Sequence, residues 1–441
     1  RGLGIAALDR APVDAGAQRA GEISLARGAR RGAARRVVEA IDCLRAAHER
    51  HPAHPGVLYN LARIVQDAGD KARAAGLFER VLALAPGMQQ AWRGYGNCLV
   101  DLGHVDDAVA AYDRNVALLR GVASHDPAHA DYRTTTPAKL RHDIEQLRWL
   151  AEAGVALDGG GDPALLAERF AAALALVERR AQGQQVVALE PEEIRLLSGA
   201  YNLLLHRPAG ARLAGRALGP GIDWRAVERG YAETAPGIAW IDGLLSPEAL
   251  EGIRRHCLAA TVWFRFRFPK GYVGGFWDEG FVSPLMLQVA EELRLAAPSI
   301  FGRHSLRKIW AFKYDARLDG IPIHADFAAV NVNFWVTPDE ANLDPEGGGL
   351  VVWDREAPSG WDFARYNTDE RAMRGFLADN GARAHRIAHR CNRAVVFNSD
   401  LMHETDRLSF RPGYANRRVN VTMLYGRRGD DLSGTGAPAR R

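Results

Sequence analysis

The chain has 441 residues, of which 47% are hydrophobic and 25% are charged, and its formal net charge is +4. This globular composition excludes collagen, coiled coil and disorder as descriptions of the whole chain, and the length suits about three domains. No apolar stretch approaches the ~20 residues of a membrane span, and the four cysteines lack a CxxC spacing, which predicts a soluble, cytoplasmic protein with free thiols. The 57 basic and 53 acidic residues are interspersed, so the charge does not indicate a nucleic-acid-binding face.

Residues 21–122 repeat with a period of ~34 residues, the length of one helix pair in a known class of helical repeats. In three successive units the aligned positions hold small residues and then larger apolar ones: Ala40, Ala74 and Ala108, then Leu44, Phe78 and Tyr112. The pattern resembles a tetratricopeptide array, in which helix pairs stack and leave a concave surface. The alternative is an alanine-rich helical bundle without repeats. A flexible segment is predicted at residues 1–20.

Helical periodicity continues beyond the repeats. Apolar residues recur at helical spacing in 137–154 and 162–180, on either side of the glycine-rich sequence DGGGD. We interpret residues 123–221 as a helical cap and connector. A further short helix is predicted at 246–258, because Ser246 can cap it and a proline occupies its first position.

From about residue 222, aromatic and β-branched runs alternate with turn residues. These runs are KIWAFKY (308–314), VNVNFWVT (330–337), LVVW (350–353), RAVVFN (393–398) and RVNVTMLYG (418–426). Short strands without intervening helices are typical of a sandwich or jelly roll. The predicted fold class is therefore α + β and multidomain, with an N-terminal helical solenoid, a jelly roll (double-stranded β-helix) at 222–428 and a disordered tail at 429–441.

Three residues of the predicted strands are candidate metal ligands. His324 and Asp326 are two positions apart, so a strand would direct both side chains to one face. His403, from a distant strand, would complete a set of two histidines and one carboxylate. Such a facial triad leaves three adjacent coordination positions open and suits non-haem Fe(II).

An HxD spacing alone is weak evidence, because His104 and Asp106 show it as well, in a helical turn where we expect solvated surface. His385 and His389 have the spacing of helical ligands but lead into a strand, so we expect them to be structural or exposed. His403 itself could be a buried histidine of the core.

The last predicted strand carries a candidate carboxylate-binding face. Alternation places Arg418 and Thr422 on one polar face, together with an asparagine, and Tyr314 ends an upstream strand within possible reach. The planar guanidinium of arginine can bind both oxygens of a carboxylate, and a hydroxyl adds a third bond. A solvent-facing strand edge is the alternative, and Arg417 and Arg411 are rivals for the binding role.

The ordered set Tyr314, His324-Ala-Asp326, His403 and Arg418 with Thr422 resembles the Fe(II)/2-oxoglutarate-dependent oxygenases of the prolyl-hydroxylase branch, over roughly residues 222–428. The resemblance implies that His324, Asp326 and His403 bind the iron. It also implies that Arg418 binds the far carboxylate of 2-oxoglutarate with help from Thr422 and Tyr314, and that O2 is the third reactant. Repeats followed by an oxygenase also resemble the aspartyl/asparaginyl β-hydroxylases, which lack the carboxylate ligand that Asp326 provides here.

The function implied is hydroxylation of an unactivated C–H bond in a peptide or protein side chain or a carrier-bound metabolite. The repeats would recruit that substrate, or would only brace the oxygenase domain. An interaction scaffold with an inactive jelly roll is the first alternative, and a cupin-like Zn or Mn enzyme is the second. The glycine- and aromatic-rich residues 271–281 form either a lid over the site or a plain surface loop.

Overall fold

The computed structural model describes residues 41–122, 129–158, 160–181, 186–234, 237–268, 272–315 and 320–428. These residues fall into two compact units that meet in the sequence between Cys98 and Leu99. The segment at 1–20 and the tail at 429–441 lie outside the described residues. No helix of the described part is long and apolar enough to cross a bilayer.

The first unit consists of helices that bury a regular apolar stripe. After helical residues 41–50 come α2 (Pro55–Asp67), α3 (Lys71–Leu84) and α4 (Gln89–Leu102), whose last residues belong to the second unit. Asp70 caps α3, because its carboxylate accepts a hydrogen bond from the Arg73 amide at 3.2 Å. The predicted repeat positions are buried at Leu58, Leu61, Ala62, Ala74, Phe78 and Val81. The absence of a side chain at Gly94 lets α4 approach α3 closely, because a Cβ there would lie 2.5 Å from the Phe78 ring.

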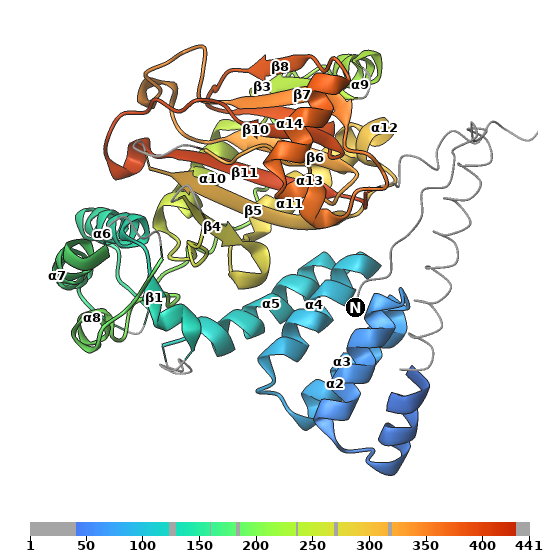
Figure 1. The fold of residues 1–441 in the computed structure, drawn as a ribbon, viewed down its shortest axis with the longest axis vertical. Helices are drawn as coiled ribbons and strands as arrows, with labels where there is room; N and C mark the ends of the chain where they lie inside the picture. Colours follow the sequence, from blue (N-terminus) through green and yellow to red (C-terminus); the bar gives the residue numbers. More distant parts are fainter. Residues whose placement is uncertain are drawn as a thin grey trace, which may run out of the picture. The chain divides into compact units, whose positions relative to one another are not determined.

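The second unit begins with α5 (Val105–Arg120) and continues through a group of helices. Its next elements are η1 (Ala130–Tyr132), β1 (Thr134–Thr135), α6 (Pro137–Glu152), α7 (Pro163–Ala181), β2 (Val187–Ala188), α8 (Pro191–Leu197) and α9 (Trp224–Glu233). The helices α6, α7 and α8 lie together (Figure 1) around a core that includes Leu140, Leu150, Phe170 and Val177. The connector therefore has a hydrophobic core of its own.

Two antiparallel sheets form the rest of the second unit (Figure 1). The larger has the order β3 (Ile238–Asp242), β9 (Arg393–Asn398), β6 (Val330–Trp335), β11 (Arg418–Tyr425), β5 (Leu306–Tyr314) and β4 (Val273–Phe276). The smaller has the order β10 (Leu401–Thr405), β7 (Leu350–Glu356) and β8 (Ala384–Ile387). Both contribute to one buried cluster: Ile238, Trp335, Val395 and Phe397 from the larger sheet, and Leu350, Val352, Ile387 and Leu401 from the smaller. The predicted jelly-roll architecture is confirmed.

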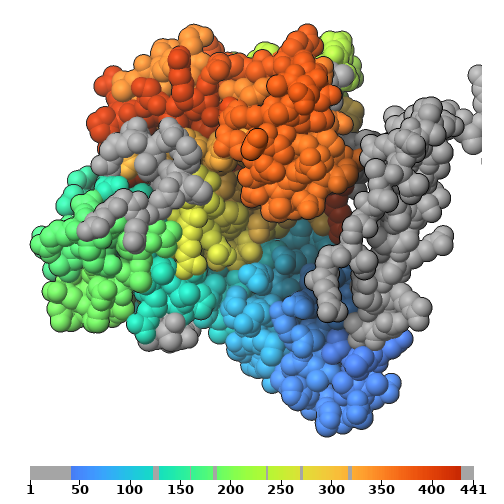
Figure 2. Space-filling view, in the orientation of Figure 1, coloured from blue at the N-terminus to red at the C-terminus, as the bar shows by residue number. Residues whose placement is uncertain are grey.

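Helices cover the remaining faces. The face of the larger sheet that points away from the smaller one contacts α10 (Pro247–Ala259) and α11 (Pro284–Ala296), where Lys313 bonds the Cys257 carbonyl at 2.9 Å and Tyr425 bonds the Ala290 carbonyl at 3.1 Å. Ser246 caps α10 as predicted. The shorter helices are η2 (Trp277–Glu279), α12 (Pro298–Phe301), η3 (Asp339–Ala341), α13 (Phe363–Asn367), α14 (Glu370–Asp379) and η4 (Tyr414–Asn416). The insertion with α13 and α14, between β7 and β8, forms part of the orange surface in Figure 2.

The interpretation of residues 271–281 as a lid or plain surface loop is wrong for the part that the structure describes. Val273–Phe276 is strand β4, paired with β5, and Trp277 is 1% exposed. Glycine makes the strand possible, because a Cβ at Gly274 would lie 2.9 Å from the Phe312 ring. This segment is a fixed edge of the larger sheet.

Both α5 and α6 pack against the sheet domain. The Asn115 side chain donates to the Asp278 carbonyl at 2.6 Å, and the Tyr112 and Trp277 ring centroids are 5.3 Å apart. Gln146 of α6 donates to two carbonyls at the C-terminal end of α10, those of Leu258 and Ala260, each at 3.0 Å. The last helix of the predicted array and the connector thus share packing with the sheet domain.

Arg120 is central to this packing, and we expect its loss to destabilise the second unit. Its guanidinium is fully buried, bonds Asp131 at 2.7 Å and lies 3.4 Å from Glu279. Arg120→Ala removes the buried cation from two carboxylates, which keep only the partly exposed Arg265 and Arg267 as partners. We expect a loss at the lower end of the range of about 3–5 kcal/mol of unfolding free energy that is typical of a broken buried pair. Urea denaturation measures the loss. Arg195→Ala, which removes an exposed pair with Glu192, is the control and should change stability by less than ~1 kcal/mol; equal losses in both variants contradict the expectation.

Candidate functional site

His324, Asp326 and His403 meet at one point between the two sheets. One ligand atom from each lies within 4.8 Å of the others, and among the described residues this is the only such group of histidine, cysteine or carboxylate side chains. The two imidazole centroids are 4.2 Å apart, and His403 Nε2 lies 3.5 Å from Asp326 Oδ2. Asp326 and His403 are buried, and His324 is partly exposed. The three predicted ligands are therefore brought together.

Backbone pairing explains how distant residues converge. His324 and His403 face each other in an isolated antiparallel bridge, with amide-to-carbonyl distances of 2.9 and 2.8 Å. Each Nδ1 donates to a carbonyl two residues earlier, of Pro322 at 2.9 Å and of Leu401 at 3.0 Å. Because Nδ1 is the protonated nitrogen in both rings, both Nε2 atoms are left as acceptors. This is the tautomer that can bind a metal.

The His324–Asp326 segment is not a regular strand, contrary to expectation, since only the bridge at His324 is strand-like. Its backbone is held instead by the insertion after β7. The Ala325 amide donates to the Tyr366 carbonyl at 2.8 Å, and the Asn367 side chain donates to the Ala325 carbonyl at 3.0 Å. These bonds fix the peptide between the two ligands.

The electrostatic environment favours metal-binding forms. Burial, together with neighbouring His403, lowers the pKa of His324 to about 4, so its imidazole is neutral near pH 7. Burial opposes ionisation of Asp326, but the proximity of His403 and His324 and the hydrogen bond from the Asn331 amide outweigh it and hold the pKa of that carboxyl below its usual value. The site therefore offers the neutral imidazole of His324 and the carboxylate of Asp326 beside His403.

Arg418 is buried beside this group without an acidic partner. It is 1% exposed, and its Nε and Nη2 donate to the carbonyls of Gly348 and Gly349 at 2.5 and 2.9 Å. The carbon between its nitrogens lies 4.8 Å from the Tyr314 ring centroid. Nη1 is buried and unbonded, and no carboxylate of the described residues lies within ion-pair distance of Arg418. A buried cation that no carboxylate of the described residues contacts directly favours an anionic ligand.

The two rival arginines are engaged elsewhere. Arg417 pairs with Glu145 at 2.7 Å and with Asp315 at 3.4 Å, on the opposite side of β11. Arg411 is exposed and bonds the Glu340 carbonyl at 2.7 Å. Strand alternation predicts that Arg417 and Arg418 lie on opposite sides of β11, since neighbouring residues of a strand point to opposite faces.

One pocket contains the metal-ligand candidates and Arg418. Its empty volume is about 350 Å³, and the predicted residues Tyr314 and Thr422 line it as well. The remaining lining residues are Trp310, Phe312, Ile321, Asn333, Leu350, Thr405 and Asn420. All six residues predicted for the site thus border a single cavity, with an aromatic wall from β5.

Sequence reasoning missed the role of the buried asparagines below this pocket. Asn331 and Asn333 of β6 connect Asp326 to Thr422, whose hydroxyl donates to Asn333 Oδ1 at 2.7 Å. The alternation in VNVNFW was a usable signal, because it places both asparagines on the same face as Trp335. Their partners depend on the pairing of β6 with β11, which the sequence did not reveal.

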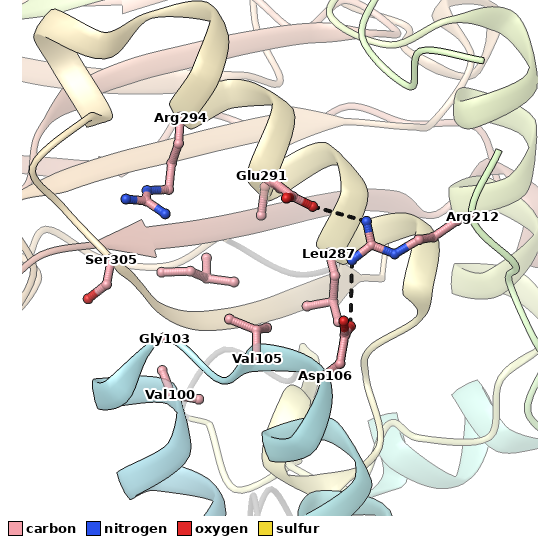
Figure 3. Close-up of a pocket in the computed structure, with 11 residues that line it drawn as sticks. Val100, Gly103, Val105, Asp106, Arg212, Leu287, Glu291, Arg294 and Ser305 are labelled. Atoms are coloured by element: carbon pink, nitrogen blue, oxygen red, sulfur yellow. Dashed lines mark hydrogen bonds and ion pairs between the residues drawn. The ribbon is translucent and has the colours of Figure 1, made fainter. Parts of the chain in front are cut away.

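A larger pocket lies elsewhere in the second unit, with an empty volume of about 700 Å³ (Figure 3). It is bordered by the turn between α4 and α5 and by α11. Its Arg212 bonds Glu291 at 3.0 Å and lies 3.5 Å from Asp106, as the dashed lines in Figure 3 show. That arginine is therefore paired with carboxylates, unlike the buried Arg418 of the smaller pocket.

The other histidines with ligand-like spacing do not join the site. His104 is exposed at the start of α5 and His385 lies in β8, as expected for surface and structural residues. His389 is buried, with its ring centroid 5.7 Å from that of Trp335 and 5.2 Å from that of Phe410. Both of its nitrogens are unbonded.

We expect His389 to make stability depend on pH. Burial, with Arg418 and Arg393 nearby, lowers its pKa to about 3. The unfolded chain binds this proton below ~6.5, so stability falls as the pH drops through the interval from 6.5 towards 3. His389→Phe should reduce the loss of unfolding free energy between pH 7 and pH 5 by about 1–2 kcal/mol. Urea denaturation at both pH values measures this, and identical losses in both proteins would count against it.

Comparison with known proteins identifies the N-terminal region. A family model described as tetratricopeptide repeat matches residues 25–88 and 59–123. The N-terminal region contains tetratricopeptide repeats. Among curated proteins, no significant match to the chain was found.

Solved structures similar to this chain include oxygenases. A prolyl-4-hydroxylase from Pseudomonas putida is 17% identical, with 46% of this chain and 99% of that one covered and a TM-score of 0.31. HygX from Streptomyces hygroscopicus, with nickel, 2-oxoglutarate and hygromycin B bound, is 16% identical over 45% of this chain and 86% of its own, with a TM-score of 0.32. The non-haem α-ketoglutarate-dependent epimerase SnoN from nogalamycin biosynthesis is 14% identical over 49% and 94%, with a TM-score of 0.34.

Proposed function

We propose that this protein is an Fe(II)- and 2-oxoglutarate-dependent dioxygenase that hydroxylates an unactivated C–H bond. The observation that carries the proposal is the presence, in one pocket, of a two-histidine, one-carboxylate group and a buried arginine without an acidic partner. Neither feature alone specifies the chemistry. Together they provide for a metal with open positions and for an organic anion beside it.

The donor set fits Fe(II). His324 Nε2, His403 Nε2 and the Asp326 carboxylate would hold the ion on one side, because both Nδ1 atoms are engaged by carbonyls. When bound, Fe(II) supplies O2 activation, while 2-oxoglutarate is oxidised to succinate and CO2 and one oxygen atom of O2 enters the substrate's C–H bond.

The chain's own residues bind and orient the organic reactants. Arg418 would hold the far carboxylate of 2-oxoglutarate through its unbonded Nη1, with Tyr314 and Thr422 beside it. The carbonyls of Gly348 and Gly349 fix the guanidinium before the ligand arrives, which reduces the entropy lost on binding. Trp310 and Phe312 give the pocket an apolar wall beside these reactants.

We infer that the repeats recruit the substrate, a peptide or protein side chain or a carrier-bound metabolite. Stacked helix pairs provide an extended surface for such partners. The packing of α5 on η2 supports a bracing role for the end of this region as well.

Succinate release tests the proposed function. The purified chain is incubated with Fe(II), 2-oxoglutarate and O2 in the presence of peptides, folded proteins or carrier-bound metabolites. Stoichiometric succinate and a product heavier by one oxygen atom support the hydroxylase. Absence of 2-oxoglutarate decarboxylation under all conditions favours the scaffold with an inactive jelly roll, and turnover that needs Zn or Mn without 2-oxoglutarate favours the cupin-like enzyme.

A further inference from the structure

Three buried asparagines connect Asp326 to the opposite end of the pocket. Asn331 Nδ2 donates to Asp326 Oδ2 at 2.5 Å, and Asn333 Nδ2 donates to Asn331 Oδ1 at 2.6 Å. Asn420 Nδ2 then donates to Asn333 Oδ1 at 2.6 Å. All three side chains are at most 5% exposed. The result is a continuous chain of amides from the carboxylate of the candidate metal site to the strand that carries Arg418.

The direction of this chain is fixed at one end. An ionised carboxylate only accepts hydrogen bonds, so Asn331 must present its NH2 group to Asp326 and its oxygen to Asn333. Asn333 must therefore donate its NH2 group to Asn331, which leaves its oxygen to accept from Asn420. The same oxygen also accepts a hydrogen bond from the Thr422 hydroxyl at 2.7 Å. At the far end, the oxygen of Asn420 is buried and unbonded. Only one orientation of each amide satisfies the series.

The strands explain why these residues align. Asn333 pairs with Thr422 in the register of β6 and β11, and alternation brings Asn331 onto the same face. On the neighbouring strand β9, the paired positions are Val395 and Phe397. A buried amide is costlier than these apolar side chains unless it is bonded. Polar residues at two successive positions therefore indicate a requirement beyond filling the core.

We propose that Asn331, supported by Asn333, is a positioning residue for Asp326, which it holds in the orientation that shares one metal ion with His324 and His403. The inference rests on the proposed function, because it concerns the same metal site. Hydrogen bonds to a ligating carboxylate fix its rotation, and loss of such a partner typically lowers metal affinity by ~10–100-fold. Asn333 acts one bond farther away, so its loss has a smaller effect.

Mn(II) titration of the full-length protein tests this role, with calorimetry for affinity and electron paramagnetic resonance for the symmetry of the bound ion. Asn331→Leu should weaken Mn(II) binding ~10–100-fold and change the spectrum of what binds. Asn333→Leu should weaken binding by less. Asn115→Leu is the matched control: it removes an equally buried amide from α5, distant in the sequence from the triad, and should bind Mn(II) as the unmodified protein does.

Asn331→Ser keeps a polar side chain too short to reach Asp326, and it carries the same test if Asn331→Leu does not fold. Unchanged affinity and spectrum in the folded Asn331 variant overturn the positioning role. Equal losses in the Asn331, Asn333 and Asn115 variants also overturn it, because they indicate general destabilisation. Failure of the unmodified protein to bind Mn(II) contradicts the proposed function instead, so the two failures are distinguishable.

Discussion

Replacing His403 with alanine is expected to abolish divalent metal binding and turnover together. The imidazole supplies one of three donors, and its partner His324 lies directly opposite in the antiparallel bridge. A site with one histidine and one carboxylate holds a divalent ion weakly, so we expect the affinity for Fe(II) or Mn(II) to fall by more than ~100-fold, beyond the loss typical of residues that only support a ligand. Anaerobic calorimetry and succinate release measure the two effects.

His104→Ala is the control for the HxD spacing, because His104 is exposed and directly precedes Val105 and Asp106, the first two residues of α5. This variant should bind metal and turn over normally. His256→Ala controls for the loss of a buried imidazole elsewhere in the unit. Metal binding with unchanged stoichiometry and affinity in His403→Ala would show that the three residues are not the ligands.

Replacing Arg418 with methionine is expected to weaken 2-oxoglutarate binding while Fe(II) binding is retained. Methionine keeps much of the length of the side chain but removes the charge and the donors that would meet a carboxylate. Loss of one partner from a buried, charged hydrogen-bonded pair costs about 2–5 kcal/mol, which corresponds to roughly 30-fold or more in the dissociation constant. Calorimetry with the Mn(II)-loaded protein provides both affinities.

Arg411→Met is the control, since Arg411 is exposed and bonds only a backbone carbonyl among the contacts that the structure gives. It should leave 2-oxoglutarate binding unchanged. If Arg411→Met reduces the affinity and Arg418→Met does not, the anchor has been assigned to the wrong arginine.

Local patterns were sufficient to predict much of the fold and the residues that meet in the pocket. Helix caps such as Ser246 and the spacing of Ala74 and Phe78 depend on neighbours in the sequence, and the structure confirms them. Strand alternation likewise separates Arg418 from Arg417 correctly. These features need no knowledge of which elements pair.

Other features depend on contacts between distant segments and could not be predicted in this way. Strand β4 contains two glycines and reads locally as a loop, and it becomes a strand because the Phe312 ring occupies the space over Gly274. The bond from Asn367 to the peptide between His324 and Asp326 joins the connection between β7 and β8 to the segment between β5 and β6.

The packing of the connector is also non-local. Arg417 follows the sheet domain's final turn, whereas its partner Glu145 belongs to α6. No pattern near either residue indicates that pairing. The boundary between the connector at 123–221 and the proposed oxygenase domain at 222–428 therefore remains a prediction, because the two segments pack together.

Anaerobic binding of 2-oxoglutarate, measured with and without Fe(II), tests the central claim most directly. One site must contain both the metal and the arginine anchor. We expect one equivalent of Fe(II) to bind, and 2-oxoglutarate to bind tightly only to the Fe(II)-loaded protein. Asp326→Ala should lose both Fe(II) binding and the tight binding of 2-oxoglutarate. Arg418→Met should lose the tight binding of 2-oxoglutarate but keep Fe(II) binding. Binding of 2-oxoglutarate that is unaffected by Fe(II) and by both substitutions would contradict the claim.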